Sequence, residues 1–150
     1  MASQSTHHVT LISAASAYLA SMFTHAWKAL IFSHNGEGLH NLSTRHLTVI
    51  ASIGLAALWF LPAFARGTPH PSLWLIAIGI GSMVFCRVQF GTAAAAGLSL
   101  LMLLTEPVGA LLIFGAGSLG KLLSSALGCW SLVASLVYVN QCIHSQKQKN

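Results

Sequence analysis

The sequence predicts an all-α integral membrane protein, a bundle of five transmembrane helices, and its composition is the first reason. Hydrophobic residues make up 55% of the 150 residues, and charged residues make up only 6%. A soluble domain carries roughly 25% charged residues. Because so few charged side chains cannot cover a globule in water, the apolar residues must face lipid. The composition therefore excludes a soluble enzyme, a nucleic-acid-binding domain and a disordered chain.

The second observation is the length of the apolar runs. A helix needs about 20 apolar residues to cross the hydrocarbon core of a bilayer. Five runs of about this length follow one another, and nothing divides the chain, so residues 1–150 are expected to form a single transmembrane domain. The predicted spans are residues 10–32, 47–65, 73–90, 93–116 and 119–143.

The boundaries of these spans follow from the residues between them. The first run is too long for a signal peptide, and no Lys or Arg precedes it, so we expect no cleaved leader. The second run stops at Arg66 and Gly67. Only residues 89–92 separate the third run from the fourth, which predicts a tight helical hairpin or one long bent helix. Four helices are therefore the alternative to five. The fifth run ends before the polar tail that starts at His144.

The positive charges predict an orientation, because cytoplasmic loops are enriched in Lys and Arg. With five spans, five basic residues fall on one side and two on the other. The five are Lys28, Arg45, Arg87, Lys147 and Lys149, and the two are Arg66 and Lys121. We therefore expect the N-terminus outside and the C-terminus in the cytoplasm. A bacterial inner membrane is the default location for so short a multi-span chain.

The cysteines and histidines do not predict a cofactor. The three cysteines form no CxxC pair. Of the eight histidines only His25 lies inside a span, whereas a membrane haem needs pairs on facing helices. The spacing of His34, His40 and His46 fits no metal site well. We therefore expect no metal, no cofactor and no enzyme activity.

Glu106 is the most informative residue, because it lies inside the fourth predicted span. A carboxylate at mid-membrane costs on the order of 2.5–3.5 kcal/mol. Glu106 is therefore expected either to couple transport to a proton or cation, or to bind substrate, or to stay neutral and hydrogen-bond a neighbouring helix. Pro107 follows directly and kinks the helix. Such breaks mark binding sites in some transporters, and in other proteins they only adjust packing.

Three further candidates carry a positive charge or a titratable ring. His25 and Lys28 lie at i and i+3, so they share one helix face. They are expected to line a polar cavity, opposite Glu106, or else Lys28 reaches to the interface and His25 bonds within the bundle. Arg87, at the end of the third span, is either an anion ligand or an interface anchor.

The fifth span carries small residues on one helix face. Small residues at such spacing let helices approach closely, so this face predicts helix packing within the fold or between protomers. The residues are Ser124, Gly128, Ser131 and Ser135.

From residue 74 to 128 the sequence resembles an EamA-type half of the drug/metabolite transporter superfamily. The resemblance lies in the run that begins at Trp74, the alanine-rich 93–97, the segment 103–112 with Glu106-Pro107-Val108, and Gly128. Where the family usually has a Gly-Glu pair between its last two helices, this chain has Gly120-Lys121. The resemblance implies a five-helix module. Family members contain two such halves, or assemble from two small chains.

Two functions fit these features. The first is a transport or flippase module for a small metabolite, drug or lipid-linked group, acting as a homodimer or with another membrane protein. The second is a non-catalytic accessory subunit of a larger membrane complex, whose small-residue faces serve docking. Lipid is the expected partner in both cases, and nucleic acid is not.

Overall fold

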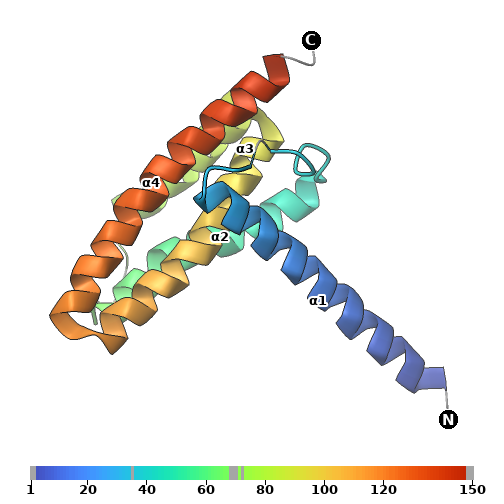
Figure 1. Ribbon diagram of the computed structural model, residues 1–150, viewed down its shortest axis with the longest axis horizontal. Helices are drawn as coiled ribbons and strands as arrows, with labels where there is room; N and C mark the ends of the chain where they lie inside the picture. Colours follow the sequence, from blue (N-terminus) through green and yellow to red (C-terminus); the bar gives the residue numbers. More distant parts are fainter. Residues whose placement is uncertain (1–2, 35, 68–70, 72, 148–150) are drawn as a thin grey trace.

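The computed structural model describes residues 3–34, 36–67, 71 and 73–147, and within these ranges the regular structure is helical throughout. The helices are α1 (Ser3–Leu30), α2 (Thr44–Ala65), α3 (Leu73–Gly115) and α4 (Gly117–Lys147). Figure 1 shows α2, α3 and α4 packed together, with α1 projecting away from them. The prediction of an all-α protein is confirmed.

The helices number four among the described residues, where five were predicted, because α3 takes up both the third and the fourth predicted spans. Gly91 inside α3 has φ 85° and ψ −179°, a conformation that is essentially restricted to glycine. Ser99 Oγ lies 3.5 Å from Met83 Sδ. In a straight helix these two residues would be about 24 Å apart. The two arms of α3, before and after Gly91, therefore fold back on each other.

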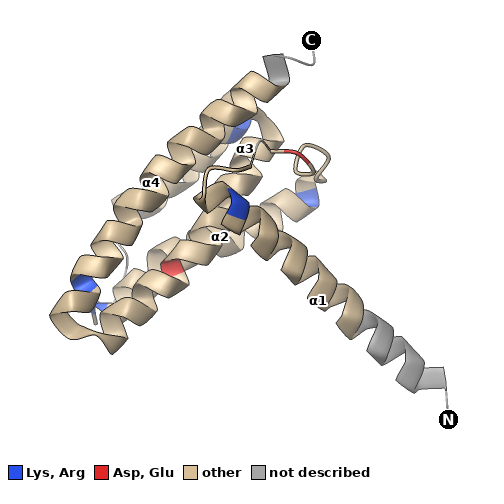
Figure 2. Cartoon of the chain, in the orientation of Figure 1, with Lys and Arg blue, Asp and Glu red and all other residues tan. Residues whose placement is uncertain are grey.

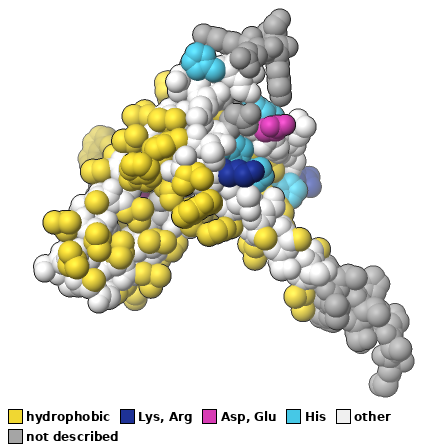
Figure 3. Space-filling model, viewed as in Figure 1, with side chains coloured by type: hydrophobic (Ala, Val, Ile, Leu, Met, Phe, Trp, Pro, Cys, Tyr) yellow, Lys and Arg dark blue, Asp and Glu magenta, His cyan; other side chains and the backbone are white. Residues whose placement is uncertain are grey.

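Three helical segments in the described part of the chain are long and apolar enough to cross a membrane. They are Thr44–Ala65, Ile76–Gly115 and Gly117–Ser145. Many of their large apolar side chains are exposed, such as Phe64, Ile78 and Leu136. Hydrophobic side chains cover much of the visible face of the bundle in Figure 3. The chain is therefore an integral membrane protein.

The second arm of α3 forms the core of the bundle. The four alanines at 93–96 are at most 1% exposed. Tyr138 of α4 is fully buried, and its hydroxyl donates a hydrogen bond of 2.8 Å to Ala93 O. A Cβ on Gly97 would overlap the ring of Tyr138, and a Cβ on Gly54 would lie 2.8 Å from Ser99 O. Residues with little or no side chain thus allow α2 and α4 to approach α3 closely.

Helix α1 touches the bundle only near its C-terminal end. Ala26 and Ala29 are buried there, and Trp130 Nε1 of α4 donates a hydrogen bond of 3.0 Å to Leu30 O. Farther from the bundle, Ile12 and Leu19 are exposed. Most of α1 therefore projects from the bundle with none of the other described helices against it (Figure 1).

The basic side chains gather at the two ends of the bundle, as Figure 2 shows. Arg87 donates a hydrogen bond of 3.4 Å to Thr44 Oγ1, which places the end of the first α3 arm beside the start of α2. At the opposite end Arg66 and Lys121 line one cavity. This separation matches the two groups used to predict the orientation. Lys149 and the side chain of Lys147 lie outside the described residues.

Candidate functional site

Glu106 lines a cavity of about 290 Å³ between α2, the second arm of α3, and α4. We call it the Glu106 cavity. Along α3, Glu106 is roughly 14 Å from the end of the helix at Gly115, since each residue rises 1.5 Å. That is close to half the thickness of the hydrocarbon core, which is about 30 Å. The other lining residues are Leu58, Pro62, Arg66, Thr105, Gly109, Ala110, Ile113, Ser124, Ser125, Leu127 and Gly128.

The local sequence explains why the helices leave space here. Pro62 in α2 and Pro107 beside Glu106 in α3 both lie inside their helices, where each removes a backbone hydrogen bond. A Cβ on Gly128 would meet no atom within 4 Å. Gly109 faces Ser124, whose Oγ would be 3.1 Å from an added Cβ. Missing side chains thus open the space, and hydroxyls line it.

One acidic and one basic side chain line the Glu106 cavity. Arg66, in the turn that ends α2, lines the cavity together with Glu106. Thr105, Ser124 and Ser125 add hydroxyl groups that can donate or accept hydrogen bonds. This set of groups can hold a proton or bind a small cationic or polar molecule.

The four small residues predicted as a packing face of α4 lie in two kinds of surroundings. Ser124, Ser131 and Ser135 are half-buried, and Ser131 Oγ lies 3.5 Å from Thr105 Oγ1 of α3. Gly128 is exposed and borders the Glu106 cavity. The face therefore both packs against α3 and borders the cavity.

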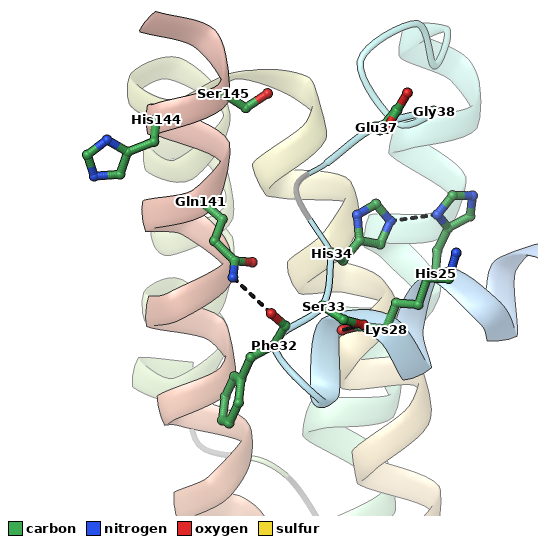
Figure 4. A pocket seen from close by; sticks show the side chains of 10 residues that line it. All are labelled: His25, Lys28, Phe32, Ser33, His34, Glu37, Gly38, Gln141, His144 and Ser145. Atoms are coloured by element: carbon green, nitrogen blue, oxygen red, sulfur yellow. Dashed lines mark hydrogen bonds between the residues drawn. The ribbon is translucent and has the colours of Figure 1, made fainter. Parts of the chain in front are cut away.

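A second cavity, which we call the loop cleft, lies at the other end of the bundle. It has a volume of about 730 Å³ and an open mouth between α1, the α1–α2 loop and the end of α4 (Figure 4). The lining residues are His25, Lys28, Phe32, Ser33, His34, Glu37, Gly38, Gln141, His144 and Ser145.

His25 and Lys28 line the loop cleft and not the Glu106 cavity. Along α4, Gly128 of one cavity and Gln141 of the other are roughly 20 Å apart. The expectation that His25 and Lys28 lie opposite Glu106 is therefore wrong. The physical reason is that α1 packs against α3 and α4 with its C-terminal part, where His25 and Lys28 border the α1–α2 loop.

Hydrogen bonds fix the chain around the loop cleft. Phe32, two residues after the end of α1, has φ 61°, a left-handed conformation common just beyond helix C-termini. Its carbonyl accepts a hydrogen bond of 2.9 Å from Gln141 Nε2. The Ser33 N–H donates to Lys28 O at 2.8 Å. The loop is thus tied both to α1 and to α4.

His34 and His25 form a directed pair of hydrogen bonds inside the cleft. The Gly36 N–H donates to His34 Nδ1 at 2.8 Å, and His34 Nε2 lies 2.6 Å from His25 Nδ1. Because His34 Nδ1 accepts, the proton of the neutral ring is on Nε2, which donates to His25. The N–H of neutral His25 is therefore at Nε2. Figure 4 shows the two rings facing each other.

The surroundings of His34 favour its neutral form. The side chain is only 5% exposed, and its ring meets the Tyr138 ring edge-on at 5.6 Å between centroids. Burial, followed by the nearby His25 and Lys28, lowers the pKa of His34 from 6.5 to about 4, although Glu37 acts in the opposite direction. His34 is therefore uncharged at neutral pH.

Sequence reasoning did not find the His25–His34 pair. His34 was grouped with His40 and His46 as a weak metal candidate, yet within the described ranges no three His, Cys, Asp or Glu side chains come close enough to hold a metal. The only local sign was a glycine two residues after His34, which allows the turn that supplies the Gly36 N–H. The partner of His34 comes from α1, so sequence spacing alone could not identify it.

Arg87, the remaining candidate, is exposed and donates a hydrogen bond to Thr44, so it joins the first arm of α3 to α2.

The fold and the two cavities define a helical membrane protein with a mid-depth carboxyl group. Comparisons with known proteins find no matching family model, no matching curated protein and no matching solved structure.

Proposed function

We propose that the chain is a transport or flippase module for a small metabolite, drug or lipid-linked group. One observation carries the proposal: the carboxyl of Glu106 lines a cavity at mid-depth, between three helices. Burying a carboxyl at this depth is costly, so such residues usually mark ion or substrate pathways. The EamA-type resemblance, which includes Glu106 and Pro107, supports the same function.

In this proposal Glu106 takes up a proton or a cationic group of the substrate. Arg66 competes for the same carboxylate, which limits how tightly the ligand is held and so helps its release. Pro62 and Pro107 let α2 and α3 bend beside the cavity. Helices interrupted in this way line binding sites in several transporter folds.

The proposal includes five membrane crossings, formed by α1, α2, the two arms of α3, and α4. The N-terminus is then outside and the C-terminus in the cytoplasm of a bacterial inner membrane, in keeping with the excess of basic residues at the loop end. As an EamA-type half, the chain would act as a homodimer or with a second membrane protein.

The alternative, an accessory subunit, is favoured by a different observation. Phe23 and Trp27 of α1 stack with ring centroids 6.5 Å apart, and both are at least half exposed. A projecting helix with exposed aromatic residues suits docking onto a larger complex. Native mass spectrometry of the extracted particle separates the cases, because a homodimer fits the transport module and a fixed ratio with other chains fits the subunit.

The transport proposal is tested in proteoliposomes that contain a pH-sensitive dye and an imposed pH gradient. A panel of small amines and metabolites is added, and the collapse of the gradient is measured. Glu106→Gln should abolish the response. Glu37→Gln is the matched control, since Glu37 is the only other acidic residue of the chain and lies at the loop end. Equal responses from Glu106→Gln and the wild type would overturn the proposal.

A further inference from the structure

We infer that the loop cleft is a binding site for a phosphate group, as carried by a phospholipid headgroup or a soluble phosphate ester. This inference is independent of the proposed transport function, because the cleft shares no lining residue with the Glu106 cavity.

The first step is the set of hydrogen-bond donors. Lys28 brings an ammonium with three N–H donors, and it lies one helical turn after His25 on α1. The bonds from Gly36 to His34 and from His34 to His25 leave the donor of His25 on Nε2, away from its partner. Two donors from one helix face therefore reach the same cleft.

The second step is convergence from another helix. Ser145, near the end of α4, lines the cleft, and Figure 4 shows it on the side of α4 that faces the α1–α2 loop, whereas the His144 ring points away from the loop. The Ser145 hydroxyl can donate one hydrogen bond. A tetrahedral phosphate has several acceptor oxygens, so it can accept from both helices at once. The volume of about 730 Å³ leaves ample room for it.

The third step is the position of the cleft, which favours a lipid as the source of the phosphate. The cleft lies at the end of the bundle where most of the basic side chains gather (Figure 2). Trp27, beside Lys28 in the part of α1 that borders the cleft, is half exposed. Aromatic residues concentrate at the headgroup level, and basic pockets between transmembrane helices bind headgroups.

Glu37 gives the inference a second electrostatic test. Among the described residues that line the cleft it is the one carboxylate, so it repels a phosphate while Lys28 attracts it. Removing the charge of Lys28 should weaken binding, and removing that of Glu37 should strengthen it. Opposite effects of two neighbouring substitutions are not expected from damage to the fold.

The experiment measures binding to the delipidated, purified protein in a non-ionic detergent, followed by tryptophan fluorescence. The probes are dihexanoyl phosphatidylglycerol and glycerol phosphate. Arg45→Gln is the matched control, because Arg45 is an exposed basic residue at the same end that lines a different groove. Circular dichroism verifies that each variant keeps its helices.

Lys28→Gln should weaken binding by about tenfold or more, the effect of losing a hydrogen bond to a charged group. Glu37→Gln should tighten it, and Arg45→Gln should leave it within about twofold, as for an exposed and screened charge. Binding of the lipid alone identifies a headgroup site, whereas binding of both probes identifies a site for the phosphate itself. No binding of either probe, or equal losses in Lys28→Gln and Arg45→Gln, would overturn the inference.

Discussion

The buried His34 makes a quantitative prediction about stability and pH. The folded structure lowers the pKa of His34 from 6.5 to about 4, chiefly through burial. Between these two values the unfolded chain binds a proton at this residue and the folded chain does not. The free energy of unfolding therefore rises with pH across this window. The contribution is fully present above pH 6.5 and is lost as the pH falls towards 4.

The size of the effect follows from the shift. One pKa unit corresponds to about 1.4 kcal/mol, so at pH 5 the protein should have lost about 2 kcal/mol relative to neutral pH, and about 3 kcal/mol at pH 4. The two rings are in direct hydrogen-bond contact, so the measured titration belongs to the His25–His34 pair.

The perturbation is His34→Asn, because the Oδ1 atom of asparagine can accept a hydrogen bond from an N–H two residues ahead. The variant thus keeps the bond from Gly36 and loses the titratable ring. Its stability will be lower at every pH, since His25 loses its donor. The dependence on pH is the test: the variant should lose about 2 kcal/mol less than the wild type between neutral pH and pH 5.

The assay is urea unfolding in detergent micelles at several pH values, followed by tryptophan fluorescence. His46→Asn is the control, because His46 is an exposed histidine whose Nδ1 contacts Ser43 Oγ at 2.7 Å. This control should keep the wild-type dependence on pH. If His34→Asn loses as much stability as the wild type between pH 7 and 5, the reasoning about the buried pair is refuted.

Substitutions of glycine test the packing and the reversal of α3. Gly97→Ala should destabilise the fold by about 1–3 kcal/mol, because the added Cβ overlaps the Tyr138 ring, whereas Gly128→Ala, with open space, should be neutral or slightly stabilising in the same unfolding assay. Gly91→Ala should cost at least about 1–3 kcal/mol, because its backbone conformation is nearly exclusive to glycine, and Gly81→Ala, in open space, is the control. Tyr138→Phe removes the buried hydrogen bond from the Tyr138 hydroxyl to the Ala93 carbonyl and should cost about 0.5–1.5 kcal/mol, measured as a shift in the urea midpoint.

The apolar runs were enough to predict the helical membrane fold. The second predicted span, residues 47–65, lies within α2, and residues 119–143 lie within α4. The break between residues 90 and 93 was visible in the sequence, and Gly91 supplies the backbone that makes it a reversal. Hydropathy could not decide whether the two arms form one helix or two. The residues on both sides of Gly91 are helical and apolar, and the reversal depends on the backbone of that one residue.

The candidate sites were predicted less completely, for a physical reason. The cost of burying Glu106 is a local property of the residue and the span that holds it, so the sequence alone identified it. The His25–His34 pair depends on how α1 meets the bundle, and the burial of His34 depends on Tyr138 from a third segment. Contacts between residues so far apart in the chain leave no periodic pattern in the sequence from which they could be predicted.

The distribution of the two carboxyl groups allows the two proposed sites to be tested separately. Glu37 lines the loop cleft, and Glu106 lines the Glu106 cavity. Along α4, Gly128 of one cavity and Gln141 of the other are roughly 20 Å apart, a distance at which exposed charges are largely screened at physiological salt. Glu37→Gln should therefore alter phosphate binding and leave the transport response unchanged, while Glu106→Gln should do the reverse. If each substitution altered both responses, the two cavities would have to be coupled through α4, the helix that lines them both.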